Sequence, residues 1–569
     1  MSRRLPVLTS FRGYAPNRIP ADLVAGVTVW AVLVPEALAY ATIAGVSPVV
    51  GLYAAPSALL LYAVFGSSRH LVVGPMAATA ALSAAAIANV DDPASALALT
   101  AGLAVVVGLI GLAAGVVRLG FLASFISEPV LKGFIIGLAL TIIIGQVPKL
   151  FGVPGGDGDF FEKTWDLLTS LGDTQWRTLA VGAGSLAVVL LLRRFVPKAP
   201  APLIAVILGI VAVAVFGLDD KGVDIVGHID SGLPSVGLPD LGWSDYTGLI
   251  GSAIGVLLVG FAEGLGAAKT YAQQAHYEID PNKELMGLGA ANLGAGLTSG
   301  MVVNGSLSKT AVNGSAGATS QLSGVFVAVL TVLTLLFLTD LFEDLPEATL
   351  AAVVIAAVVE LVDVEALRRL WRVHSAELDS IYGPASRADL IAAVAAMLGV
   401  LVFDTLPGLF IGIAVSVLLI VYRASRPHVA TLGLAADGSR WEDVDRHPDA
   451  AQRAGVLVVR PESGLFYANA DNVKGDITGR LQDTTTAVVL DLADVPVIDV
   501  TSIGMLTDLA DDLDRRGIVL VIARDIGQVR DVLVAAGATS LADRAHPTVA
   551  AAVASLPDAS SAERRPTDS

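Results

Sequence analysis

The stretch VNGSLSKTAVN, residues 303–313, places one lysine and five hydroxyl or amide side chains between apolar segments. Small polar side chains of this kind can donate hydrogen bonds to an anion, and Lys309 adds positive potential. Ser306 follows an Asn-Gly pair that breaks the chain, and serine is a good N-cap for a helix. A helix start has free N–H groups and the positive end of the helix dipole. The stretch therefore predicts an anion site.

A matching break lies in the first part of the chain, at residues 70–90, HLVVGPMAATAALSAAAIANV. Gly74 permits unusual backbone angles, and Pro75 suits the first position of a helix. The helix that follows is short for a full membrane crossing. Two such half-helices, with converging N-termini, would bind an anion without a buried arginine. The alternative at each break is a kink with small residues for tight packing, which two matching breaks disfavour.

Two glutamates lie inside apolar sequence, Glu36 in VLVPEALAYA and Glu263 in LLVGFAEGLGAAK. Ionisation is costly in such surroundings, so each is a candidate functional residue. The structural alternative for Glu36 is a lipid-boundary or packing role. For Glu263 the alternative is a structural partner of Lys309 or of a free helix end.

Apolar runs that could hold these residues in a bilayer fill residues 21–422. A helix that crosses the hydrocarbon needs about 20 apolar residues, or fewer when it is broken or shielded. A polar loop after residue 217 divides the runs into two halves of seven. The fourteen predicted spans are 23–44, 48–66, 75–90, 97–117, 121–147, 177–196, 199–217, 247–270, 282–300, 306–322, 323–339, 348–362, 388–403 and 406–422.

Charged residues in the loops predict the orientation of these spans. Acidic residues gather in the loops of one side, and the fourteen spans return the chain to the side of its N-terminus. Basic loop residues mark the cytoplasmic side, so we expect both termini in the cytoplasm of a bacterium and the spans in its plasma membrane. No convincing cleavage site follows the first apolar run, which we interpret as an uncleaved span. The basic residues on the N-terminal side are Arg69, Arg118, Arg193, Arg194, Lys198, Arg368, Arg369, Arg372 and Arg387.

The composition excludes several other classes of protein. The chain has 569 residues, of which 54% are hydrophobic and 16% charged, and its mean hydropathy is +0.70. It has no cysteine, and its seven histidines show no metal-binding spacing, so we expect no metal site, no cofactor and no enzyme activity. The net charge of −17 argues against a nucleic-acid partner.

The end of the chain has the pattern of a small soluble α/β domain. We predict strands at 455–461, 464–469, 487–495 and 518–524, and helices at 470–482, 498–517 and 525–537. The predicted organisation is an N-terminal segment at 1–20, a transmembrane domain at 21–425, a soluble domain at 426–556 and a disordered tail at 557–569.

Long motifs of the chain resemble a known family. Residues 47–75, SPVVGLYAAPSALLLYAVFGSSRHLVVGP, and residues 278–293, EIDPNKELMGLGAANL, are similar to the SulP sulfate permeases, the solute carrier 26 group. VIDVTSIG at 497–504 resembles the STAS domain of the same family. The resemblance implies fourteen spans in a seven-plus-seven inverted repeat of the uracil-transporter type. In that fold a core domain moves against a gate domain, usually in a homodimer, and a cytoplasmic α/β STAS domain follows.

The resemblance also implies site residues, with three departures from the family pattern. Glu36 stands where Gln is common, Tyr40 where Phe is common, and Lys309 where Arg is usual. A carboxylic acid beside an anion favours a proton-linked cycle, with Glu36 and Glu263 as the proton-coupling residues. The implied substrate-binding residues are Glu36, Tyr40, Pro75, Met76, Ala77, Ser306, Leu307, Ser308 and Lys309.

One regulatory candidate comes from the STAS resemblance. Thr501 occupies the loop position that is phosphorylated as Ser in the antagonist proteins of that family. The alternative, which we favour, is that Asp499, Thr501 and Ser502 only cap the following helix.

These residues together predict proton-coupled uptake of sulfate or a similar small anion. The expected partners are the anion, protons, the lipid bilayer and a second copy of the chain. Sodium-coupled bicarbonate uptake, an anion sensor that signals through the soluble domain, and a channel-like chloride pathway are the alternatives on the same fold.

Overall fold

A computed structural model describes residues 8–557, except 12–13, 88–91, 122–126, 157, 198, 230, 360, 363–364, 366–367, 369–387 and 404. The chain forms two compact units, Met1–Arg372 with Asp389–Ser416, and Val373–Ala388 with Val417–Ser569. The predicted tail lies outside the described residues beyond residue 557. Several of the loop residues used for the orientation also lie outside them: Lys198, Arg369, Arg372 and Arg387.

The first unit consists mainly of apolar helices. Within the described residues, six helices are long and apolar enough to cross a membrane, counting α18, which continues into the second unit. They are α1 (Ile19–Ile43), α4 (Pro93–Val116), α5 (Glu128–Phe151), α7 (Trp176–Phe195), α10 (Ile250–Gln274) and α18 (Thr405–Ser425). Shorter helices are α2 (Val49–Phe65), α3 (Ala77–Ile87), α8 (Ala201–Phe216), α11 (Pro281–Leu297), α12 (Leu307–Ser315), α13 (Leu322–Phe337), α14 (Glu347–Val359) and α17 (Ala388–Phe403).

Each predicted span overlaps one of these helices, and the number of spans that cross the bilayer stays a prediction. Two predicted bounds are wrong. The tenth predicted span, 306–322, overlaps α12, which already ends at Ser315. The fifth predicted span begins at residue 121, whereas α5 starts at Glu128. Two helices were not predicted because they lie in polar loops, α6 (Phe160–Ser170) and α9 (Trp243–Gly248).

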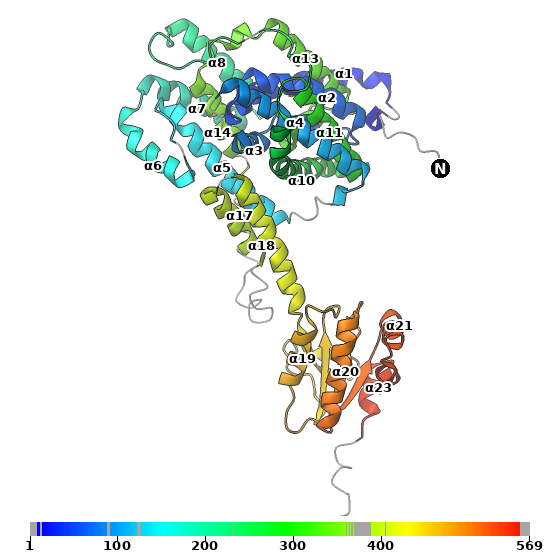
Figure 1. Cartoon of the computed structure of the whole chain (residues 1–569). Helices are drawn as coiled ribbons and strands as arrows, with labels where there is room; N and C mark the ends of the chain where they lie inside the picture. The colour runs from blue at the N-terminus through cyan, green and yellow to red at the C-terminus, as the bar shows by residue number, and fades with distance from the viewer. Residues whose placement is uncertain are drawn as a thin grey trace, which may run out of the picture. The chain divides into compact units, whose positions relative to one another are not determined.

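Glycines let the helices of the first unit approach closely. In α4 and α11, which lie side by side (Figure 1), a Cβ on Gly108 would lie 2.4 Å from the Leu293 nitrogen. In α2, a Cβ on Gly51 would lie 2.0 Å from the Ala37 carbonyl oxygen of α1. Larger residues would force these helices apart, so the glycines fix α1 and α11 beside their neighbours.

Two short strands connect the halves of the first unit. β1 (Val72–Gly74) and β2 (Asn304–Ser306) pair in antiparallel orientation, with Val72 opposite Ser306 and Gly74 opposite Asn304. All six residues of these strands are buried. Because α3 follows β1 and α12 follows β2, the pair brings the two predicted half-helices together.

The second unit contains a six-stranded sheet in the order β4-β3-β5-β6-β7-β8. The neighbours β5 to β8 are parallel, while β3 is antiparallel to both β4 and β5. The strands are β3 (Val429–Leu434), β4 (Trp441–Asp443), β5 (Val456–Pro461), β6 (Ala487–Asp491), β7 (Val519–Ala523) and β8 (Ala545–His546). The helices are α19 (Ala470–Gly479), α20 (Val500–Arg515), α21 (Gly527–Ala535), α22 (Thr539–Asp543) and α23 (Val549–Ala554).

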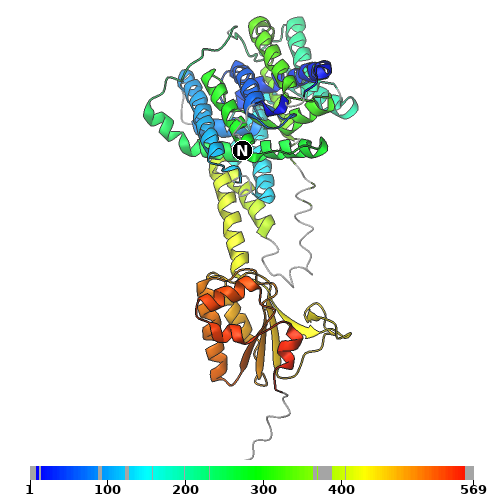
Figure 2. The ribbon, with the colours of Figure 1, turned by 90° about the vertical axis from the view of Figure 1, so that its right-hand side faces the viewer.

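Helices cover both faces of this sheet, as Figure 2 shows. One core joins α19 to α22 with the sheet, and a second joins α23 with the other face. The predicted strand at 464–469 is wrong. The segment forms a turn in which the Asn469 carboxamide oxygen accepts a hydrogen bond from the Phe466 amide at 3.0 Å. Only Leu465 pairs there, in a single bridge to Ile498.

Candidate anion site

The β1–β2 pair connects the starts of α3 and α12. Since the strands are antiparallel, α3 leaves from one end of the pair and α12 from the other. Each helix therefore points its N-terminus back toward the strands. One strand pair therefore joins the starts of the two predicted half-helices. That an anion binds between them stays a prediction.

The start of α12 is capped by a neutral side chain. The Ser306 hydroxyl accepts a hydrogen bond from the Lys309 amide at 3.2 Å and lies 3.2 Å from the Ser308 hydroxyl. Ser306 is buried, whereas Leu307 and Ser308 are exposed. The first turn of this helix therefore has exposed residues, and its first N–H groups have no partner within the helix.

The start of α3 has a different chemistry. Pro75 has no N–H group to donate, and it is buried together with Ala77, while Met76 is half-buried. The Thr79 hydroxyl donates to the Met76 carbonyl at 3.2 Å, and the Ala80 amide donates to the same oxygen at 2.9 Å. This helix start offers backbone N–H groups and no charged side chain.

Lys309 and Glu36 form a buried ion pair beside the start of α12. The Lys309 Nζ lies 2.6 Å from the Glu36 Oε2, and their side chains are 1% and 4% exposed. The ammonium also lies 5.1 Å from the centroid of the Tyr40 ring, within the range of a cation–π interaction. The alternative that Glu263 is the partner of Lys309 is therefore wrong, since Glu36 holds that place. The pair joins a residue of the first half to one of the second.

Glu263 is tied to the same strands through another contact. Its Oε2 accepts a hydrogen bond from the Asn304 side-chain amide at 3.2 Å. α10 approaches β2 closely because both have glycine at the contact, where a Cβ on Gly305 would lie 2.9 Å from the Gly264 Cα. A change at Glu263 would thus act directly on β2, two residues before the Ser306 cap.

Several positioning residues escaped the sequence analysis. The Asn292 side chain makes two hydrogen bonds of 2.9 Å to the backbone of Val303. The Thr310 hydroxyl accepts from the Val72 amide at 3.0 Å, and the Gln321 amide donates to the Leu71 carbonyl at 2.8 Å. Their polar side chains within apolar segments could have indicated a positioning role, because buried polar groups need hydrogen-bond partners.

Two other buried carboxylates belong to structural networks away from the helix starts. Glu284 accepts hydrogen bonds from the Tyr62 hydroxyl at 2.6 Å, from the amide and hydroxyl of Ser67, and from the Ser68 amide. Asp22, which the sequence analysis missed, accepts hydrogen bonds from the backbone and side chains of two residues before α13, Thr319 and Ser320.

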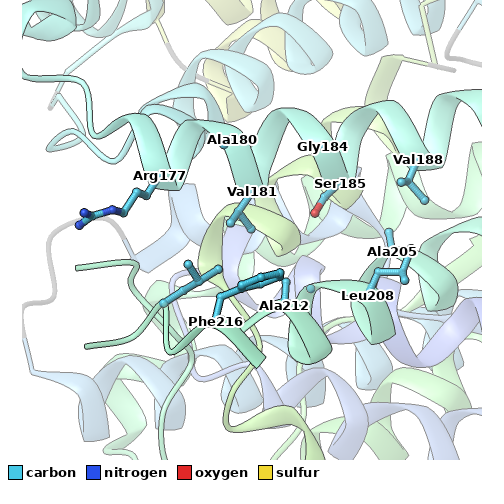
Figure 3. Close-up of a pocket in the computed structure, with 12 residues that line it drawn as sticks. Arg177, Ala180, Val181, Gly184, Ser185, Val188, Ala205, Leu208, Ala212 and Phe216 are labelled. Carbon is cyan, nitrogen blue, oxygen red and sulfur yellow. The ribbon is translucent and has the colours of Figure 1, made fainter. Parts of the chain in front are cut away.

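A cavity of 380 Å³ between α7 and α8 holds none of the predicted residues. Its lining is almost wholly aliphatic, with Arg177 at one end and Phe216 beneath it (Figure 3). Such a lining would strip water from a small anion without replacing its hydrogen bonds, so we do not assign it to transport. In the described part of the chain, no group of three or more His, Cys, Asp or Glu residues could hold a metal ion.

In the second unit, Asp499 caps α20. Its carboxylate accepts hydrogen bonds from the Ser502 amide at 2.8 Å and the Tyr467 amide at 2.7 Å. Burial raises the pKa of Asp499, but these hydrogen bonds outweigh it and lower the pKa below the usual 3.8. Ser502 is buried and Thr501 is exposed in the first turn. Asp499 therefore has the capping role that was expected as the alternative, and Thr501 is accessible.

The fold and this site define a multi-pass membrane anion transporter followed by an α/β domain. The chain belongs to the Sulfate permease family, whose sequence model matches residues 19–383, and the STAS domain model matches residues 447–552. A probable sulfate transporter of Mycobacterium tuberculosis is 37% identical over 536 residues, which cover 93% of this chain and 94% of that protein. Sulfate transporter 1.1 of Arabidopsis thaliana is 30% identical over 91% of this chain and 82% of its own length.

Solved structures agree with this fold. The murine Solute Carrier 26 family member A9 anion transporter superposes with a TM-score of 0.85 at 23% identity, over 97% of this chain and 95% of that one. The transmembrane domain of a cyanobacterial bicarbonate transporter superposes with a TM-score of 0.59 at 23% identity, over 71% of this chain and 98% of that one. The inverted-repeat transporter fold expected from the sequence is thus confirmed.

Proposed function

We propose that the protein takes up sulfate together with protons, and that sulfate binds between the starts of α3 and α12. The observation that carries this proposal is the β1–β2 pair, which holds two positive helix ends together beside the Lys309–Glu36 ion pair. The substrate-binding residues that we propose are those expected from the sequence, on α1 and at the starts of α3 and α12. The relatives named as sulfate transporters support sulfate as the anion.

The charge of the site supports a coupling to protons. Each helix start carries about half a positive charge, and Lys309 adds one more, so the site has about two positive charges when Glu36 is protonated. This charge matches the two negative charges of sulfate. While Glu36 is ionised and paired with Lys309, the site has about one positive charge less and holds a dianion poorly.

The transport cycle follows because Glu36 and the anion compete for the Lys309 ammonium. A proton that binds Glu36 releases the Lys309 ammonium, which then turns to the anion. The anion in turn stabilises the protonated form of Glu36, because an ionised carboxylate beside sulfate would repel it. Proton and sulfate therefore bind together and leave together. Glu263 is the second proton carrier, and its protonation alters the contact with Asn304 on β2.

Bicarbonate uptake is the second candidate, and the same ion pair favours it. With Glu36 ionised, the site has a net charge of about one, which suits a monovalent anion. In this case Glu263 would serve sodium, since its carboxylate contacts β2 and forms no ion pair in the described residues. Uptake that requires external sodium and ignores pH would favour this candidate.

The arrangement in the cell is part of the proposal. Basic loop residues on the N-terminal side support cytoplasmic termini in a bacterial plasma membrane. We also propose a homodimer, as the family resemblance implies, and a regulatory role for Thr501. Phosphate on this exposed residue would repel the adjacent Asp499 carboxylate and weaken the start of α20.

Uptake of labelled sulfate into proteoliposomes at two external pH values tests the proposal. The purified full chain should accumulate sulfate faster at acid pH, in choline as well as in sodium medium. Glu36→Gln and Glu263→Gln should each remove this pH dependence, whereas Glu162→Gln on α6 should keep it. If Glu36→Gln leaves both the rate and the pH dependence intact, the coupling role of Glu36 is wrong.

A further inference from the structure

A polar pocket of 420 Å³ lies where α4 ends, against the last turns of α10 and the first turn of α11. Two cations line it, Arg118 after α4 and Lys269 on α10. The pocket contains none of the substrate-binding residues described above. Its remaining lining includes Gly120, Phe121, Leu265, Gly266 and Asn282.

The charge of this pocket is not balanced by the protein. Its lining includes no carboxylate, and among the described residues neither Arg118 nor Lys269 forms an ion pair. The neighbouring Asp280 caps α11, since its carboxylate accepts a hydrogen bond from the Asn282 amide at 2.9 Å, and it forms no ion pair with either cation in the described residues. Two like charges that share a pocket repel each other unless an anion lies between them. This is notable in a chain with a net charge of −17.

The turn that carries Arg118 is held in place by the backbone. Arg118 has a left-handed φ of 67°, an uncommon conformation for a residue other than glycine. The next residues are fixed, because the Leu119 amide donates to the Ala114 carbonyl and the Gly120 amide donates to the Asn282 side-chain oxygen at 2.9 Å. The cationic turn is therefore attached to the start of α11 before any ligand arrives.

We propose that Arg118 and Lys269 form a second binding site, for a tetrahedral oxyanion such as sulfate or phosphate. This inference rests on the proposed function and extends it. Lys269 lies six residues after Glu263 on α10, or about 9 Å along the helix, and the exposed Gly266 lies between them. With Arg118 on the cytoplasmic side, the site is a place to which sulfate passes after it leaves the central site during uptake. The phosphate headgroup of an anionic lipid has the same chemistry.

Thermal unfolding of the purified full chain in phosphatidylcholine nanodiscs, titrated with sulfate, tests this site. Binding to the folded state raises the unfolding midpoint. Arg118→Gln/Lys269→Gln should lose at least half of the sulfate-dependent rise, and Lys269→Gln alone should lose a smaller share. The control Lys163→Gln/Arg177→Gln removes the same charges elsewhere and also corrects for the general stabilisation by sulfate. It should keep the full rise.

Two further experiments distinguish free sulfate from a lipid headgroup as the ligand of the pocket, and binding in the pocket from binding in the central site. If nanodiscs with one part phosphatidylglycerol in five raise the midpoint without sulfate, and only Arg118→Gln/Lys269→Gln loses this rise, the pocket binds a lipid headgroup. Ser306→Asp blocks the central site, so its remaining sulfate response reports the pocket alone, whatever happens to the proposed function. The proposal is overturned if the pocket variant and the control respond equally to sulfate and to phosphatidylglycerol.

Discussion

The starts of α12 and α20 have the same local design with different caps. Each helix begins with a side-chain oxygen that accepts a hydrogen bond from a backbone amide in the first turn. At α20 the cap is the carboxylate of Asp499, so the positive helix end already has its anion. At α12 the cap is the neutral hydroxyl of Ser306, and the positive end stays available. The comparison teaches that a neutral cap leaves a helix end open to a soluble anion.

The surroundings of the two caps follow the same rule. Beside Ser306, the charge of Lys309 is balanced by Glu36, a group that a proton can neutralise. Beside Asp499, two backbone amides complete the cap, and no exchangeable partner is needed. The first helix start can therefore change its charge during a cycle, and the second is permanently satisfied.

The largest effect should come from Lys309→Met, which leaves the Glu36 carboxylate buried without its partner. Breaking a buried ion pair in this way costs about 3–5 kcal/mol, so the unfolding midpoint should fall steeply. Lys309→Met/Glu36→Gln should recover most of this stability but not the sulfate uptake. Lys309→Arg is the matched control and should retain both. Recovery of uptake in the double variant would show that the cation is not required.

The next effect should come from Ser306→Asp, which gives α12 the kind of cap that α20 has. Asp is a good N-cap, so α12 should keep its capped first turn, although the buried carboxylate should lower the stability somewhat. The fixed negative charge should lower sulfate uptake about a hundredfold, which corresponds to ~2.7 kcal/mol. Ser306→Thr keeps a neutral cap and should stay near the original rate. Undiminished uptake by the Asp variant would contradict the comparison.

A smaller effect is expected for Asp499→Ala, which removes the cap of α20 and costs about 1 kcal/mol of local stability. The folded-state pKa of Asp499 is lowered, so its contribution is present above its unfolded pKa and is lost as the pH falls through the folded pKa. Hydrogen exchange of the first-turn amides of α20 should thus differ between variant and original at pH 7, and the difference should shrink as the pH falls below 3.8. A difference that does not change with pH would exclude the carboxylate as the source. The exchange rates in Asp499→Ser should lie between those of the original protein and those of Asp499→Ala.

The smallest effect should come from Met76→Ala at the start of α3. This helix offers backbone N–H groups, so a shorter side chain at Met76 should change sulfate uptake by less than about threefold, or ~0.7 kcal/mol. Initial rates at several sulfate concentrations would check this. A large rise in KM would mean that the two half-helices contribute side chains equally.

Much of the fold could be predicted because its signals are local. Long apolar runs placed the helices of the first unit, and short apolar runs placed β5, β6 and β7 in the second. Strands β1 and β2 gave no such signal, because three buried residues cannot show a period. The strand at 464–469 was predicted wrongly for a different reason. Its apolar and aromatic residues suited a strand, but the Asn469 side chain closes a turn.

The individual residues of the candidate site could be predicted from the sequence, but the contacts between them could not. The half-helix starts stood out by their Gly-Pro and Asn-Gly-Ser breaks, and the buried glutamates stood out because ionisable residues are rare in apolar sequence. The Lys309–Glu36 pair was not predictable, since the two residues are 273 positions apart and Glu263 was an equally plausible partner. Which charges meet depends on packing that only the three-dimensional structure provides.

The most direct test of the central claim is the position of bound selenate, which has the shape of sulfate and can be located by its anomalous scattering. In crystals of the full chain grown with selenate, the main peak should lie between the starts of α3 and α12, within hydrogen-bond reach of Ser308 and beside Lys309. Selenate that binds elsewhere, with the space between these helix starts left to water, would contradict the account.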